Sequence, residues 1–181
     1  MEGMESSFLN PQVTLDAAHI SEGSRVADLA AGSGFFARAA ARAVGRDGLV
    51  WAVDPNSDML SRLKNLSVGE GLHNIEVVRG SLEKAGATKL PDATMDVAIL
   101  ANALFAIEDK ETAAAEVYRV LRRAGRLVLI DWSGSHGGLG PHEGHVVAAA
   151  QAKKIFEAAG FVPAEDIPAG AYHWGLLLRK R

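Results

Sequence analysis

Residues 26–44, VADLAAGSGFFARAAARAV, decide the fold class of this chain. The stretch starts as a short apolar run typical of a buried strand, passes Asp28, Gly32 and Gly34, and continues into an alanine-rich helical segment. Glycine has no Cβ, so the backbone of such a turn can approach a ligand closely. The following helix offers unpaired N–H groups to a carboxylate or phosphate. The pattern predicts a strand, turn and helix that hold a ligand, and a turn with only a packing role is the alternative.

The rest of the chain repeats this alternation of strand and helix. The β-rich runs are RVADLAA (25–31), VWAVD (50–54), IEVVR (75–79), MDVAILA (95–101) and RLVLID (126–131), each followed by a helix-like segment or a turn. This alternation is typical of an α/β protein with a parallel, doubly wound sheet. The last two strand candidates, 161–170 and 171–180, have only a Pro/Gly turn between them. We therefore expect the final strand to run antiparallel.

Capping and stop residues set the expected helix bounds. Asn10 and Pro11 form an N-cap and first-turn pair for a helix over 11–20. Glycines predict the ends of three further helices: Gly45 after 37–44, Gly125 after 112–124 and Gly160 after 144–159. We expect a single domain over 1–181, in which 1–20 is a short N-terminal segment and helix.

Composition excludes several classes of protein. The 181 residues are 48% apolar and 23% charged, which suits one globular domain with a sizeable core. Cysteine is absent, which excludes disulfides, thiolate metal sites and cysteine nucleophiles, and no metal site is expected. The net charge of -3 and the scattered Lys and Arg predict no broad basic face for duplex nucleic acid or anionic lipid. Without a signal sequence or membrane-spanning run, we expect a cytoplasmic protein.

A second acid supports the ligand-binding interpretation of the glycine turn. Asp54 ends the strand 50–54, about 20 residues after Gly34, where a carboxylate can accept both hydroxyls of a ribose. The alternative is that Asp54 caps a helix that begins at Pro55.

Two cofactors fit these residues. Gly32, Gly34 and Ala37 also satisfy the dinucleotide pattern G-x-G-x-x-A, so a nicotinamide-dependent oxidoreductase is the rival interpretation. In that rival, the apolar strand runs directly into the first glycine and a substrate domain follows. Here the acid Asp28 comes four residues before Gly32, and the chain stops after a hairpin.

Asp28, Gly32, Gly34, Asp54 and the closing hairpin together resemble the class I S-adenosylmethionine-dependent methyltransferases, in the ubiquinone/menaquinone-biosynthesis-like and arsenite-methyltransferase-like branch. Residues 95–132 look like the fourth strand, next helix and fifth strand of that family, and residues 140–181 look like its last helix and hairpin. The resemblance implies a Rossmann-like sheet of order 3-2-1-4-5-7-6, S-adenosylmethionine as cofactor and methyl transfer to a small-molecule acceptor. Arsenite methylation is not expected, because it relies on thiolates.

The resemblance also implies a role for each cofactor-binding residue. The loop 30–34 would face the methionine part, with Asp28 at its ammonium group, Asp54 at the ribose and Ser81 at the adenine. The complete implied set is Asp28, Ala30, Gly32, Gly34, Phe35, Asp54, Pro55, Ser81, Leu82, Ala101, Asn102 and Phe105.

Two positions depart from the family pattern. Ala30 stands where the family has a glycine, and we expect it to be tolerated unless the position needs a positive φ. Ser81 stands where the family has an acid, and its hydroxyl accepts a hydrogen bond without the assistance of a charge. These departures leave a catalytically silent binding module as a further alternative.

The acceptor is expected at the end of the fifth strand. The implied strand order places Asp131 and Trp132 beside Tyr172 and His173, and the loop 133–145 adds further histidines, namely His136, His142 and His145. We expect His173 to orient or deprotonate the acceptor, with Asp131 as a supporting acid and His142 as a further catalytic candidate. The alternative is that His142 and His145 begin the last helix and that His173 packs beside Trp174. Short connections indicate either an open site or one completed by a second copy of the chain.

Overall fold

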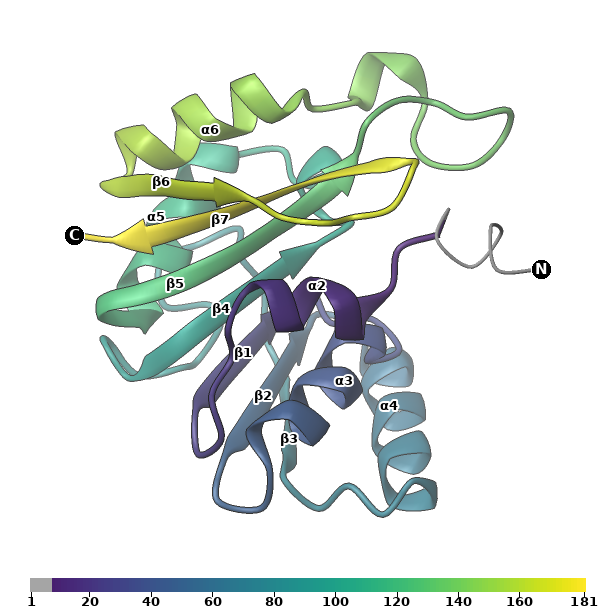
Figure 1. The fold of residues 1–181 in the computed structure, drawn as a ribbon, viewed down its shortest axis with the longest axis vertical. Coiled ribbons are helices and arrows are strands. Elements are labelled where there is room, and N and C mark those ends of the chain that lie inside the picture. The colour runs from purple at the N-terminus through teal and green to yellow at the C-terminus, as the bar shows by residue number, and fades with distance from the viewer. Residues whose placement is uncertain (1–7) are drawn as a thin grey trace.

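The computed structural model describes residues 8–181. Its centre is a seven-stranded sheet of order β3-β2-β1-β4-β5-β7-β6 (Figure 1). The strands are β1 (Arg25–Leu29), β2 (Leu49–Asp54), β3 (Ile75–Arg79), β4 (Met95–Ala101), β5 (Leu121–Trp132), β6 (Phe161–Asp166) and β7 (His173–Lys180). Strands β1 to β5 pair in parallel, and β7 runs antiparallel to both β5 and β6. The doubly wound sheet, its order and the antiparallel last strand are all confirmed.

Helices cover both faces of this sheet (Figure 1). They are α2 (Pro11–Ala17), α3 (Phe35–Val44), α4 (Ser57–Gly69), α5 (Lys110–Val120) and α6 (Ala149–Ala158), with 3-10 turns η1 (Leu104–Ala106) and η2 (Glu143–His145). Successive side chains of β5 enter different cores: Leu127 and Leu129 pack with α5 and α6, whereas Val128 and Ile130 pack with α2 and α3. The sequences of these strands are continuous runs of apolar residues because both faces of the strands are buried.

Helix α2 begins as predicted and ends early. The Asn10 side chain accepts hydrogen bonds from the N–H groups of Gln12 and Val13, which makes it the N-cap. The helix ends at Ala17 rather than at residue 20, because His19 adopts a left-handed φ of 51°.

The expected helix over 112–124 is also too long at its C-terminal end. Helix α5 ends at Val120, and β5 begins at the next residue. The carbonyl groups of Arg119 and Val120 accept hydrogen bonds from the N–H groups of Ala93 and Thr94. These external donors satisfy the last carbonyls of the helix, so the chain can turn into the strand without a glycine at that point.

The last helix starts later than the predicted residue 144. The chain first makes the turn η2 and then remains extended, and α6 begins at Ala149. Val147 is buried, and its carbonyl accepts a 2.9 Å hydrogen bond from the indole N–H of Trp174. This anchor on β7 explains the extended segment between η2 and α6. Across residues 8–181, no helix combines the length and apolar character needed to cross a bilayer.

Candidate cofactor and acceptor site

Two neighbouring cavities lie at the carboxyl ends of the central strands, where the strand order reverses between β1 and β4. The first, of about 230 Å³, is lined by Asp28, Ala30, Ala31, Gly32, Phe35, Phe36, Ala101 and Asn102. The second, of about 150 Å³, is lined by Ala30, Pro55, Gly80, Ser81, Leu82, Glu83 and Ile107. Ala30 lines both cavities, so they form two compartments that can take the two ends of one elongated molecule.

The two glycines of the turn after β1 have different roles. Gly32 has a φ of 53°, and among the described residues no atom beyond its two chain neighbours lies within 4 Å of the position that a Cβ would take. Its backbone therefore faces open space, as ligand approach requires. Gly34 has a φ of 80°, and a Cβ there would lie 2.4 Å from Cγ of Leu63 on α4. Gly34 thus has the packing role that was the alternative for this turn.

The carboxylate of Asp54 holds the backbone of the glycine turn in its conformation. Its Oδ2 accepts a 2.9 Å hydrogen bond from the Gly32 N–H, and its Oδ1 accepts one of 2.8 Å from the Asn56 N–H. Asn56 is the residue that caps α4, because its side chain accepts hydrogen bonds from Asp58 and Met59. The interpretation of Asp54 as that helix cap is therefore wrong.

Asp28 is a buried acid with an unsatisfied oxygen. Within residues 8–181, its Oδ2 has no hydrogen-bond partner. Burial raises the pKa of Asp28 to about 7, the N–H of Ala37 lowers it, and the charge of Asp54 raises it further. A buried acceptor without a partner costs free energy that a bound donor recovers. Asp28 on the cavity wall is thus suited to a cationic group.

Ala30 occupies a strained position. Its φ is 63°, in the left-handed region that favours glycine. Alanine was expected to be tolerated here unless the position needs a positive φ, and the position does need one. The methyl group of Ala30 stands at the boundary of the two compartments.

The second compartment contains an acid that the sequence analysis missed. Ser81 and Leu82 line it as expected, and the exposed Glu83 lines it as well. Ile107, beyond η1, completes the apolar part of the wall. The sequence could have indicated Glu83, because it is an acid only two residues after Ser81, the position where the family has an acid.

A buried ion pair on α5 holds the loop that forms this compartment. Glu116 accepts hydrogen bonds from the N–H of Gly86 and from both the N–H and hydroxyl of Thr88. Arg119 donates to Glu116 and to the Leu90 carbonyl. Burial alone would raise the pKa of Glu116, but the bonds from Arg119, Thr88 and Gly86 outweigh it and lower the pKa to about 2.

Nine of the twelve implied cofactor residues line the two compartments, and Gly34, Asp54 and Phe105 do not. Phe35 is 52% exposed and packs edge to face on Phe36 at 5.9 Å. The N–H of Phe105 donates a 2.9 Å hydrogen bond to Asp131, which fixes η1 to the end of β5.

His173 pairs with Trp132 across β5 and β7, as expected, and their ring centroids are 4.2 Å apart. The ring of His173 packs on Trp132. The alternative, in which His173 packs beside Trp174, is therefore wrong. Within the described chain, both ring nitrogens of His173 are buried without a hydrogen-bond partner. Burial lowers the pKa of His173, and nearby His136 lowers it further, so the ring is neutral at pH 7.

Asp131 does not support His173, and that expectation needs correction. Trp132 and His173 are opposite each other and share one face of the sheet, so the side chain of the adjacent Asp131 points to the other face. There it accepts hydrogen bonds from the N–H groups of Phe105 and Trp132. Burial raises the pKa of Asp131, and these backbone donors oppose the rise.

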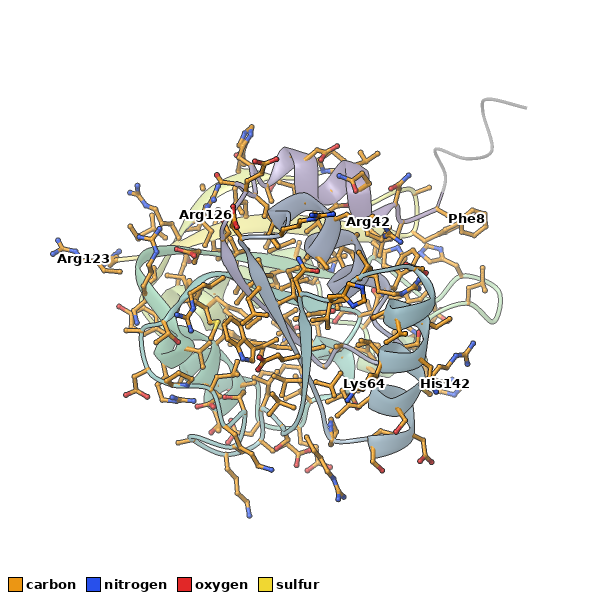
Figure 2. All side chains as sticks on the ribbon, turned by 90° about the horizontal axis from the view of Figure 1, so that it is seen from below. Phe8, Arg42, Lys64, Arg123, Arg126 and His142 are labelled. Atoms are coloured by element: carbon orange, nitrogen blue, oxygen red, sulfur yellow. The ribbon has the colours of Figure 1, made fainter. Side chains whose placement is uncertain are left out.

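The other histidines separate into two groups. His136 packs on Tyr172 at 5.0 Å, and its Nε2 lies 3.2 Å from the Ser133 hydroxyl. His142 and His145 are exposed beside η2, so they neither join His173 nor begin α6. The ring of Phe8 also lies near Tyr172, with ring centroids 5.7 Å apart, and Phe8 projects outward (Figure 2). No cluster of His, Asp or Glu suited to a metal ion occurs within residues 8–181.

Comparison with known proteins agrees with this geometry. Residues 27–129 match the family described as "Methyltransferase domain". The ubiquinone/menaquinone biosynthesis C-methyltransferase UbiE of Neisseria meningitidis is 33% identical over 120 residues, which are 66% of this chain and 47% of that protein. The chain thus spans about half the length of the curated relatives it matches.

Solved structures share the whole architecture. A SAM-dependent methyltransferase from Aquifex aeolicus is 26% identical, with a TM-score of 0.87 over 96% of this chain and 91% of that one. The arsenic(III) S-adenosylmethionine methyltransferase CrArsM from Chlamydomonas reinhardtii is 23% identical, with a TM-score of 0.70 over 88% and 64%, and shows the fold alone. The glycine turn is therefore that of a methyltransferase and not the dinucleotide-binding turn of an oxidoreductase. The chain belongs to the class I S-adenosylmethionine-dependent methyltransferase family.

Proposed function

We propose that the chain binds S-adenosylmethionine across the two compartments and transfers its methyl group to a small-molecule acceptor. One observation carries this proposal: the buried, unpartnered Oδ2 of Asp28 stands beside the open backbone of Gly32, at one end of a two-compartment site. When bound, the cofactor supplies a sulfonium methyl group that is already electrophilic. The protein then has to position the acceptor and exclude water.

The proposed roles follow the chemistry of each compartment. Asp28 would hold the ammonium group of the cofactor, and the Gly32 backbone would allow close approach of the methionine part. In the second compartment, Leu82 and Ile107 would contact the faces of the adenine, and the carboxylate of Glu83 would accept a hydrogen bond from its amino group. Asp54 would act mainly by holding the Gly32 N–H in place.

His173 remains our proposal for the residue that orients or deprotonates the acceptor. Its neutral ring can accept a proton, and a strand fixes its position. Both nitrogens are buried, so contact with an acceptor requires the ring or the side chains around it to move. Asp131 and His142 have no part in this proposal. A cytoplasmic location and self-association stay predictions of the sequence.

Calorimetry with S-adenosylhomocysteine, NADH and the Asp28→Asn variant tests the proposal. We expect S-adenosylhomocysteine to bind, NADH not to bind, and the variant to bind S-adenosylhomocysteine at least tenfold more weakly. Binding of NADH alone would contradict the proposal. No binding of either compound at millimolar concentration would favour the catalytically silent module.

A further inference from the structure

Arginine side chains gather at the end of the sheet opposite the candidate site. A hollow of about 360 Å³ is lined by Arg123, Ala124, Val162, Arg179, Lys180 and Arg181. These residues belong to the start of β5, to β6 and to the end of β7 with the C-terminus. The three segments end at the same side of the sheet (Figure 1). Arg123 projects from the outer edge of the molecule there (Figure 2). Arg179 is six residues along β7 from His173, the partner of Trp132, and at about 3.3 Å per residue this places the hollow roughly 20 Å from Trp132. It is therefore separate from the cofactor and acceptor site.

The floor of the hollow is firmly built. The ammonium group of Lys180 donates 2.7 Å hydrogen bonds to the carbonyls of both Tyr118 and Leu121, and it lies 4.2 Å from the Tyr118 ring centroid. These bonds hold the end of β7 against the α5–β5 junction. Ala124 turns the chain with a left-handed φ of 60° beside Arg123. The backbone that carries the arginines is thus held in place by these hydrogen bonds.

Their charges are not compensated by neighbouring acids. Arg126 and Arg179 are directly opposite each other across β5 and β7, an arrangement of like charges that destabilises a sheet. The described part of the chain contains ion pairs of Arg122 with Asp96 and of Arg119 with Asp92, but none of Arg123, Arg126, Arg179 or Arg181. A site of this kind is stabilised by an anion from solution.

The charge of the remaining surface limits what that anion can be. Four cations line the hollow: Arg123, Arg179, Lys180 and Arg181. They are part of 19 Lys and Arg in all, so the 15 other cations are outnumbered by 22 Asp and Glu. An extended polyanion such as duplex nucleic acid or an anionic membrane would meet net negative charge outside this corner. A compact anion would not.

We propose that the arginine hollow binds a small, multiply charged phosphate compound. Guanidinium groups match the oxygens of a phosphate through paired N–H donors, and several of them around one concave surface suit two linked phosphates. The proposal does not depend on the activity of the candidate active site.

Calorimetry with inorganic pyrophosphate tests this site on the whole chain. We expect binding that weakens with rising salt, and at least a tenfold loss of affinity in the Arg123→Ala/Arg179→Ala double variant. The Arg123→Lys/Arg179→Lys variant should lose part of the affinity, because lysine keeps the charge without the paired donors. Lys153→Ala/Lys154→Ala, which removes two exposed cations of α6, is the matched control and should bind like the parent. An unchanged thermal unfolding curve in the arginine variants shows that they fold.

Three results would overturn the proposal. The first is no response to pyrophosphate in the parent chain. The second is an equal loss of pyrophosphate affinity in the Lys153→Ala/Lys154→Ala control. That result would mean that exposed cations in general attract pyrophosphate. The third is sedimentation with phosphatidylglycerol vesicles, or retention by a duplex oligonucleotide, without a pyrophosphate response.

Discussion

The N–H of Gly32 donates a 2.9 Å hydrogen bond to Oδ2 of Asp54, so the acid at the end of β2 shapes the turn after β1. The same carboxylate accepts the N–H of Asn56 at the start of α4. One side chain therefore holds two segments that border the cofactor compartments.

Asp54→Ala is expected to lower both stability and cofactor affinity, because it leaves two backbone donors without their acceptor. Each loss costs about 1–3 kcal/mol. Asp54→Asn keeps one carbonyl oxygen and should have an intermediate effect. Thermal unfolding and calorimetry with S-adenosylhomocysteine measure the two effects. A variant that loses affinity at full stability would indicate that Asp54 contacts the cofactor and does not support the loop.

Asp28 is expected to make cofactor binding depend on pH. Its pKa is about 7 in the free protein, and a cation beside the carboxylate lowers that pKa. Binding must then release a proton, so affinity should fall about tenfold per pH unit below pH 7. Calorimetry between pH 5.5 and 7.5, in buffers of different ionisation enthalpy, counts the proton. Asp28→Asn should bind weakly and without this pH dependence, and a parental profile in that variant would assign the proton to another group.

The same acid should destabilise the free protein at neutral pH. A folded-state pKa raised from 3.8 to about 7 means that stability falls as pH rises through this interval. Asp28→Asn has no charge to bury, so it should raise the melting temperature more at pH 8 than at pH 4. Equal shifts at both pH values would contradict the raised pKa.

Ala30→Gly is expected to stabilise the chain by up to about 1.6 kcal/mol. Relief of the left-handed strain stabilises the folded chain by about 1–2 kcal/mol. The greater conformational freedom of glycine in the unfolded chain offsets about 0.4–1 kcal/mol of this stabilisation. Ala31→Gly is the matched control, because Ala31 has no positive φ and should lose stability. Urea unfolding compares the two variants. Similar destabilisation in both would show that Ala30 is unstrained.

Glu83→Gln is expected to change base recognition in the second compartment. Loss of the charged acceptor should weaken S-adenosylhomocysteine binding about three- to tenfold and leave S-inosylhomocysteine, which lacks the amino group, unaffected. Competition binding measures both ligands, with Glu157→Gln on the exposed face of α6 as the control. An equal loss for both ligands would remove Glu83 from recognition of the amino group.

His173→Phe is expected to separate stability from turnover. Phenylalanine fills the apolar place beside Trp132 without two unsatisfied nitrogens, so the melting temperature should stay equal or rise. Once an acceptor is known, turnover should fall while S-adenosylhomocysteine affinity holds. Parental turnover in His173→Phe would exclude a role for the imidazole in the reaction.

Local patterns were sufficient to predict the strands and the antiparallel direction of the last one, whereas the order of the strands came from the resemblance to the methyltransferase family. Short apolar runs between glycine stops mark strands that are buried on both faces, and the Asn10–Pro11 pair marks the start of a helix. Helix ends were less predictable. Arg119 and Val120 end α5 because residues 93 and 94 donate to them, and no pattern within the helix contains that information.

The sequence indicated which site residues are neighbours. Asp28 and Gly32 line one cavity and Asp54 accepts a hydrogen bond from Gly32, while their roles toward the cofactor stay predictions. The orientation of Asp131 depends on its register with β7, and the conformation of Ala30 depends on the whole turn after β1. The arginine hollow joins β5 to β7, so it appears only when the sheet is assembled.

The position of β7 between β5 and β6 constrains the order of folding during synthesis. While the ribosome is still adding residues 173–180, the long apolar strand β5 has one edge paired with β4 and the other edge open. An unpaired edge of this kind can join another chain, so we expect the nascent protein to be prone to aggregation until β7 has been added. Slow translation before residue 173 should therefore reduce the soluble yield more than slow translation before residue 95.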